Sequence, residues 1–186
     1  VVTWTNCGGG SMGVALKIQR VPGTAASPFM KYIARGNFGA FSISEFATNS
    51  DTINPDAASA NGAITVAAVS ATDPGNDTPE SYSSRGPKTR LFNKDGVRLA
   101  SPETRLKPEV AAADAVATTV PGFTSFSGTS ASVPSAASIA ANLISTNPSA
   151  SPTEIRTQTT AAGNSIECTL SRLVPDPDCA AGFLLA

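Results

Sequence analysis

Residues 126–134 read Phe-Ser-Gly-Thr-Ser-Ala-Ser-Val-Pro and join a strand-like segment to the clearest helix of the chain, predicted over residues 130–145. A serine at this place has its hydroxyl at the positive end of a helix dipole, beside backbone N–H groups that have no partner in the helix. Such groups can stabilise an oxyanion, and Gly128, which lacks a Cβ, lets another backbone approach closely. Local chemistry leaves two interpretations open: Ser130 is a nucleophile, or Ser130 or Thr129 is a helix cap.

The segments around this motif predict parallel β-strands and a second helix. Residues 63–69 (Ala-Ile-Thr-Val-Ala-Ala-Val) and 110–113 (Val-Ala-Ala-Ala) are continuous apolar runs, as expected for strands buried on both faces of a parallel sheet. The helix over 130–145 is apolar on nearly every side, which predicts that it is buried. Ser151, Pro152 and Glu154 form a capping box that opens another helix.

The chain has a different character before residue 53. Short strand candidates over residues 14–20, 31–35 and 40–44 are separated by Gly and Pro, a pattern that predicts a small β-rich segment. The sequence therefore predicts a β-rich segment over 1–52 and an α/β region over 53–186.

Composition excludes several classes of function. The chain has 186 residues, 15% charged and 41% hydrophobic, with a net charge of −1, which is too apolar for a disordered tail. Nucleic acid and membranes are not expected as partners, because clustered Lys and Arg are lacking and the longest apolar run is too short to span a bilayer. There is no histidine, so a mechanism that needs an imidazole must take it from another chain.

Three cysteines are present. Cys168 and Cys179 bracket a short loop, and a disulfide between them is predicted if the compartment is oxidising, whereas Cys7 has no evident partner. No zinc site is expected, because three thiolates without histidine make a poor one. A calcium site is not evident, because Asp73, Asp77 and Asp95 form no recognisable ligand spacing, and the sequence leaves calcium binding open. The start at Val1 without Met or a signal peptide indicates an internal cut, and the low charge favours a secreted protein.

Residues 126–134 resemble the nucleophile motif of the subtilases, the subtilisin-like serine peptidases. Other segments resemble the family in the same order. Residues 63–69 are similar to the strand after the oxyanion region, and residues 81–87 (Ser-Tyr-Ser-Ser-Arg-Gly-Pro) to the Ser-Ser-x-Gly-Pro loop. Residues 106–114 (Leu-Lys-Pro-Glu-Val-Ala-Ala-Ala-Asp) are similar to the Lys-Pro-Asp strand, and residues 179–186 to the Gly- and Ala-rich end of the catalytic domain.

This resemblance covers about residues 53–186 and implies an α/β fold class: the C-terminal half of a subtilisin-like parallel-sheet fold with a buried nucleophile helix, preceded by a small β-rich segment. It implies that Ser130 is the catalytic serine, with Ser127, Gly128 and Thr129 beside the substrate and the oxyanion. Residues 1–52 have no counterpart in the minimal peptidase core and resemble the tail of an insertion. The alternative for that segment is a substrate- or sugar-binding module.

The sequence departs from the family at three places. The family's His after the motif proline is Ser135 here, and its following glycine is Ser138. The string Ala-Ala-Gly-Asn at residues 161–164 is similar to the family's oxyanion motif, but it follows the serine motif, so we interpret Asn164 as a helix-terminating turn. The family's Asp and His motifs would precede residue 1.

The resulting hypothesis is the C-terminal portion of a secreted serine endopeptidase that acts on polypeptides, needs no cofactor and is inactive as an isolated chain. Its expected partner is the N-terminal half of the peptidase or a second copy of itself. The alternative is a catalytically dead subtilase-like scaffold for binding or assembly. A free-standing β-rich binding module fused to a helical tail is a third alternative, disfavoured by the ordered motifs.

Overall fold

The computed structural model describes residues 5–19, 21–23, 29–32, 34, 42–46, 48, 50–54 and 56–161. The chain separates into two compact units, Val1–Ala40 and Phe41–Ala186, and the division predicted after residue 52 stays a prediction. All helices and strands of the described residues lie in the second unit. In chain order they are η1 (Asp56–Ser59), β1 (Val66–Ser70), β2 (Lys88–Phe92), β3 (Arg98–Arg105), β4 (Val110–Asp114), β5 (Val116–Ala117), β6 (Ser125–Phe126), α1 (Thr129–Thr146) and α2 (Pro152–Thr159).

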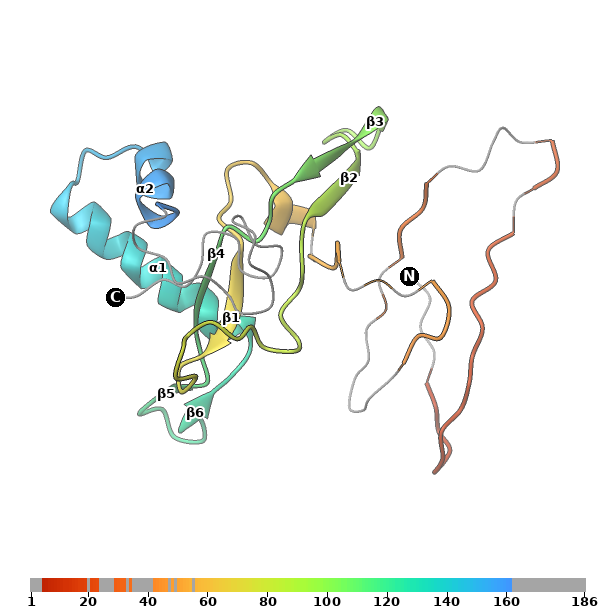
Figure 1. The fold of residues 1–186 in the computed structure, drawn as a ribbon, viewed down its shortest axis with the longest axis horizontal. Helices are drawn as coiled ribbons and strands as arrows, with labels where there is room; N and C mark the ends of the chain where they lie inside the picture. The colour runs from red at the N-terminus through yellow and green to blue at the C-terminus, as the bar shows by residue number, and fades with distance from the viewer. Residues whose placement is uncertain are drawn as a thin grey trace. The chain divides into compact units, whose positions relative to one another are not determined.

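β1 and β4 form the parallel pair that the two apolar runs predict (Figure 1). Their register places Val66 beside Val110 and Ser70 beside Asp114. Short apolar side chains are buried on both faces of this pair, as expected for strands inside a parallel sheet. One cluster contains Ala67, Val69 and Ala111, and the other contains Val110 and Ala112 together with Ala136 of α1.

Helix α1 packs against both strands of this pair (Figure 1). Its buried residues are the small ones, Ala131, Ser132 and Ala136, which allow a close approach to the sheet. The prediction that this helix is buried on nearly every side is wrong, because Val133 is 49% exposed and Ile144 47%. The strand pair covers one face of the helix, and burial is limited to that face.

Helix α2 begins with the predicted capping box, which is confirmed. Ser151 Oγ accepts a hydrogen bond from the Glu154 amide at 3.3 Å, and Glu154 Oε2 accepts one from the Ser151 amide at 2.7 Å. The Ser151 hydroxyl also donates to Glu154 Oε2, at 2.8 Å. The hydrogen bonds that the Glu154 carboxylate accepts from the Ser151 amide and hydroxyl lower the pKa of Glu154. Among the described residues, no helix is both long and apolar enough to cross a membrane.

An ion network joins α2 to the amino end of β4. The Lys107 ammonium, buried at 3% exposure, donates to Glu109 Oε1 and, at 2.7 Å, to the Ala63 carbonyl. The Arg156 guanidinium of α2 donates to the same Glu109 oxygen. Glu109 Oε2 accepts a hydrogen bond from the Thr65 amide at 2.7 Å. Glu109 therefore bridges α2, β4 and the segment that leads into β1.

The hairpin β2–β3, which was not predicted from the sequence, lies between β1 and β4 in the chain. Its turn is organised by Asn93, whose Oδ1 accepts hydrogen bonds from the Asp95 and Val97 amides, both at 2.9 Å, and by Gly96 with φ 77°. The Asn-x-Asp-Gly sequence of this turn was the available signal, since these residues favour turns and left-handed backbone. Lys88 at the start of β2 is buried and donates to the Ile53 carbonyl at 3.0 Å.

The strands predicted for the β-rich segment over residues 1–52 are not formed at the described positions. Residues 14–19, within the predicted strand over 14–20, have no strand pairing, and neither do residues 31, 32, 34 and 42–44 of the other two. Val14, Leu16 and Ile18 alternate as a strand would but are 63%, 64% and 59% exposed. A strand needs a neighbour to satisfy its backbone, and no described residue pairs with these. The other positions of the predicted strands lie outside the described residues.

Candidate active site

Ser130 lies in the first turn of α1, which the chain reaches from β4 through the β5–β6 hairpin (Figure 1). Hydrogen bonds hold the turn of this hairpin: the Thr118 amide donates to the Thr124 carbonyl at 3.2 Å, and Thr118 Oγ1 to the Phe123 carbonyl at 2.6 Å. The Phe123 and Phe126 rings meet edge to face, with centroids 6.1 Å apart. The hairpin thus fixes the backbone immediately before residues 127–130.

Gly128, not a side chain, caps the start of α1. Its carbonyl accepts hydrogen bonds from the amides of Ala131 at 2.8 Å and Ser132 at 3.4 Å, and no side chain caps this end of the helix. Gly128 has φ 114°, a backbone conformation that residues with a Cβ atom rarely adopt. Ser130 is exposed and Thr129 half-buried. The structure therefore removes the capping interpretation of Ser130 and Thr129.

A buried carboxylate holds Gly128 from the other side. Asp114, at the carboxyl end of β4, is 0% exposed, and its Oδ1 accepts a hydrogen bond from the Gly128 amide at 2.6 Å. Its Oδ2 accepts a hydrogen bond from the Tyr82 hydroxyl. The Asp114 carbonyl also accepts one from the Ala71 amide at 2.7 Å. Asp114 therefore links the end of the parallel pair, the loop that carries Tyr82 and the start of α1.

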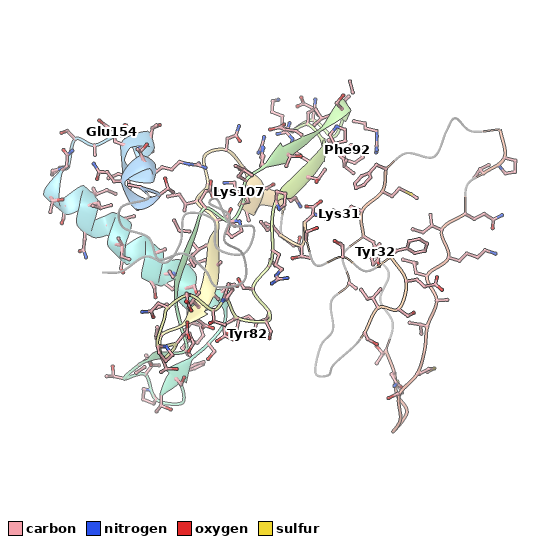
Figure 2. The ribbon with its side chains drawn as sticks, in the orientation of Figure 1. Lys31, Tyr32, Tyr82, Phe92, Lys107 and Glu154 are labelled. Carbon is pink, nitrogen blue, oxygen red and sulfur yellow. The ribbon has the colours of Figure 1, made fainter. Side chains whose placement is uncertain are left out.

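The Tyr82 loop is attached to β1. The Ala68 amide donates to Ser83 Oγ at 3.0 Å, and the Glu80 amide donates to the Ala68 carbonyl at 2.8 Å. Burial and the hydrogen bond to Asp114 raise the pKa of the Tyr82 hydroxyl above its ordinary value, although Tyr82 is 51% exposed. Figure 2 shows Tyr82 and Lys107 toward opposite ends of the β1–β4 pair. The strand ends near Tyr82 are the carboxyl ends, where open α/β sheets place their ligands.

Two serines on the inner side of α1 differ in their partners. Ser135, at the family's histidine position, donates through Oγ to the Ala131 carbonyl at 3.0 Å and to the Ala113 carbonyl of β4 at 3.3 Å. Ser132 is 0% exposed, and its Oγ has no hydrogen-bond partner in the described part of the chain. Ser135 thus ties helix to sheet, whereas Ser132 buries an unsatisfied hydroxyl.

The structure brings together only part of the predicted site. Ser127, Gly128, Thr129 and Ser130 are consecutive at the start of α1, and Ser127 is exposed. Cys168, Cys179 and Asn164 lie outside the described residues, so the disulfide and the turn at Asn164 stay predictions. Cys7 is a free, exposed thiol.

A shallow hollow of about 220 Å³ lies at the carboxyl end of β1 and does not include Ser130. It is lined by Ser70, Thr72, Asp73, Thr78, Pro79 and Glu80. The Asp73 carboxylate is engaged in its own loop, where Oδ2 accepts hydrogen bonds from the amides of Asp77 at 2.9 Å and Thr78 at 3.0 Å. Within the ranges that the structure describes, no three His, Cys, Asp or Glu residues are grouped to hold a metal ion.

A comparison with protein families matches the model of the subtilase family, peptidase S8, to residues 4–172. The chain belongs to the subtilase family. The match begins well before the serine motif and includes residues 4–52 as well as the α/β region. Membership in this family of serine peptidases agrees with the resemblance that the ordered motifs indicated.

Among solved structures, this subtilase chain is similar to sphericase, with 22% sequence identity and a TM-score of 0.50. The likeness covers 68% of this chain and 41% of the sphericase chain, so this chain spans less than half of that protein. No curated protein is significantly similar to it. The structural likeness shows the fold, and the predicted class, part of a subtilisin-like α/β fold with a parallel sheet, is confirmed.

Sequence reasoning missed Asp114 and Tyr82 as neighbours of the serine motif. The signal was an aspartate at the end of the otherwise apolar run Val-Ala-Ala-Ala-Asp, residues 110–114. A charge there is costly to bury unless it is hydrogen-bonded, which indicates a specific partner nearby. Nothing in the sequence identified that partner as the Gly128 amide.

Proposed function

We propose that this subtilase chain carries the nucleophile region of a serine endopeptidase and that Ser130 attacks the peptide carbonyl. The observation that carries this proposal is the placement of Ser130: exposed, in the first turn of α1, with no capping role. Gly128 before it is held by Asp114 at the carboxyl end of the parallel pair. Family membership supports the same class of reaction.

In the proposed reaction, Ser130 Oγ bonds to the carbonyl carbon, and the electron pair of the C=O bond moves onto oxygen. The amides of Thr129 and Ser130 have no partner within the helix, so they are available to that oxyanion, and the helix dipole favours its negative charge. Gly128 presents no Cβ to the approaching substrate backbone. Ser127, exposed on the same segment, is the further residue expected beside the substrate.

The serine proton must go to a base that this sequence does not contain. A serine hydroxyl is a weak nucleophile on its own, and the family's usual base is an imidazole. The chain has no histidine, and the nearby Asp114 carboxylate already accepts hydrogen bonds from Gly128 and Tyr82. We therefore propose that the isolated chain is inert and that a polypeptide carrying the Asp and His completes the site.

Secretion and the Cys168–Cys179 disulfide belong to the same proposal. The low charge supports secretion, and an oxidising compartment would close the loop between these cysteines. A mass difference of two hydrogens between the natively purified and the reduced peptide containing both cysteines would support the bridge. Free thiols at both Cys168 and Cys179 in protein recovered from the culture medium would contradict it.

The proposed nucleophile is tested with a fluorophosphonate probe. Ser130 Oγ would displace fluoride from phosphorus, forming a P–O bond while its proton passes to the base. We expect no labelling of the isolated chain, and labelling at Ser130 when an N-terminal subtilase segment containing Asp and His is bound. Ser130→Ala should abolish this labelling. Ser138→Ala should leave it unchanged, because Ser138 is an exposed serine of the same helix that donates only to the Ser135 carbonyl.

The alternative function, a catalytically dead scaffold for binding or assembly, is favoured by Ser135 and Ser138, which replace the family's His and Gly. It predicts that the N-terminal segment associates with this chain and that Ser130 remains unlabelled in the complex. Association measured by analytical ultracentrifugation, together with the labelling experiment, separates the two functions.

A further inference from the structure

We infer that Asp114 is a positioning residue for Ser130: its carboxylate, oriented by the Tyr82 hydroxyl, fixes the Gly128 amide and with it the first turn of α1. This inference rests on the proposed role of Ser130. It concerns residues that do not themselves touch the substrate.

The first observation behind this inference is that Gly128 makes hydrogen bonds through both of its backbone polar groups. Its amide donates to Asp114 Oδ1 at 2.6 Å, and its carbonyl accepts from the Ala131 amide at 2.8 Å. Gly128 is thus tied to the sheet on one side and to the helix on the other. Ser130 lies in the turn that the second hydrogen bond closes, so we expect a change in either bond to move its hydroxyl and the amides of Thr129 and Ser130.

The second observation is that Asp114 places a carboxylate at the N-terminus of α1. The first turn of α1 contains no acidic residue and no side-chain cap. Helix N-termini are stabilised by a negative charge, typically supplied by the helix itself. Here the 0% exposed Asp114 supplies it from β4, through a charge-assisted hydrogen bond of the strong kind. The start of α1 therefore depends on a residue of the sheet.

The third observation is that Tyr82 holds the second oxygen of the Asp114 carboxylate. Its hydroxyl donates to Asp114 Oδ2, which leaves Oδ1 facing Gly128. The Tyr82 loop is itself held on β1 by the hydrogen bond between the Ala68 amide and Ser83 Oγ, at 3.0 Å. The carboxylate is therefore held at both oxygens by groups on separate elements, an arrangement that restricts its rotation.

The test uses the full chain with Ser130→Cys as a reporter. Alkylation by iodoacetamide forms an S–C bond and releases iodide, and its pH profile gives the midpoint for ionisation of the thiol. Peptide-resolved mass spectrometry separates residue 130 from the natural cysteines. A thiol at an ordered helix N-terminus ionises below its ordinary pKa of about 8.5, so the midpoint reports the order of the first turn.

The inference predicts opposite outcomes for two substitutions of Asp114. Asp114→Asn keeps an oxygen for the Gly128 amide, so the midpoint should stay or fall. Asp114→Ala removes the anchor, so the first turn loosens and the midpoint should rise by half a pH unit or more. If Asp114 acted through its charge alone, both variants would lower the midpoint. A fall or no change with Asp114→Ala overturns the inference.

Tyr82→Phe tests the same arrangement without disturbing the buried carboxylate, which matters if Asp114→Ala does not fold. A smaller rise of the midpoint is expected, and an unchanged midpoint overturns the role of Tyr82. The matched control is Ser138→Cys, beyond the first turn of α1, whose midpoint should not respond to any of these variants. Alkylation needs no catalytic base, so failure of the fluorophosphonate experiment would leave this result intact.

Discussion

Asp114 Oδ1 lies 2.6 Å from the nitrogen of Gly128, which is 14 positions further along the chain. This hydrogen bond connects the last residue of a parallel strand to the residue that caps the helix of the serine motif. In a subtilase that uses Ser130 as its nucleophile, the sheet would therefore set the position of the reacting hydroxyl directly. The hydrogen bond from Tyr82 to the same carboxylate gives this arrangement a spectroscopic signature.

The ionisation of Tyr82 should be displaced upward in the folded protein. The chain has two tyrosines, so in the Tyr32→Phe variant the absorbance at 295 nm reports Tyr82 alone. Because folding raises this pKa above the ordinary 10.0, the stabilisation from its proton is complete below pH 10 and declines at higher pH. In Tyr32→Phe/Asp114→Asn the titration should return toward its ordinary midpoint. A normal titration of the folded Tyr32→Phe protein would contradict the Tyr82–Asp114 hydrogen bond.

Ala115→Gly should stabilise the protein. Ala115 directly follows β4 and has φ 52°, where an alanine Cβ meets its own backbone, and glycine relieves this cost of about 1 kcal/mol. Chemical denaturation should show an increase of that size in the free energy of unfolding. The control is Ala113→Gly, two residues earlier in β4, where glycine should reduce stability by about 0.5–1 kcal/mol. A loss of stability in Ala115→Gly would show that the left-handed backbone is not present.

Ser132→Ala should also stabilise the protein, by about 1 kcal/mol, because it removes a buried hydroxyl that has no hydrogen-bond partner among the described residues. Ser135→Ala is the matched control on the same helix. It should lower the free energy of unfolding by about 1 kcal/mol, because its Oγ bonds to carbonyls of both α1 and β4. Equal effects of the two substitutions in urea unfolding would contradict the difference in their partners.

Glu109→Gln should destabilise the protein by about 3 kcal/mol, since it leaves the buried Lys107 ammonium without its countercharge. Arg156 of α2 loses the same partner, so α2 should also become easier to detach. Hydrogen exchange of the α2 amides gives that second readout. Lys94→Ala breaks the exposed pair with Asp95 and should change stability by less than about 0.5 kcal/mol. If Glu109→Gln lowered the free energy of unfolding no more than Lys94→Ala does, the buried ion network would not be what holds α2 against β4.

The parts of the fold that local pattern determines were predictable from the sequence. The apolar runs at β1 and β4 can only be buried on both faces, which predicts a parallel pair. Ser151 and Glu154 specify the start of α2 through their own hydrogen bonds. Each prediction rests on the pattern within a single segment, and both are confirmed.

The parts that depend on distant partners were not predictable in the same way. Val14, Leu16 and Ile18 alternate as in a strand, but alternation does not supply a neighbouring strand, and these side chains are exposed. Val133 and Ile144 are apolar, but whether a helix is covered on that side depends on other elements. The contact of Asp114 with Gly128 joins two segments whose distance only the fold determines. The motif therefore predicted Ser130 as the nucleophile, whereas the hydrogen bond between the sheet and the start of α1 required the structure.

The most direct test of the central claim is the rate of fluorophosphonate labelling at Ser130, followed by mass spectrometry of the peptide that contains it. In subtilisin, loss of the catalytic histidine costs on the order of 10⁶ in kcat, so the isolated chain should label at the background rate of Ser130→Ala. With a bound polypeptide that supplies the Asp and His, the rate at Ser130 should rise by orders of magnitude. Labelling of the isolated chain at the rate of an intact peptidase, or at a serine other than Ser130 in the complex, would contradict the account.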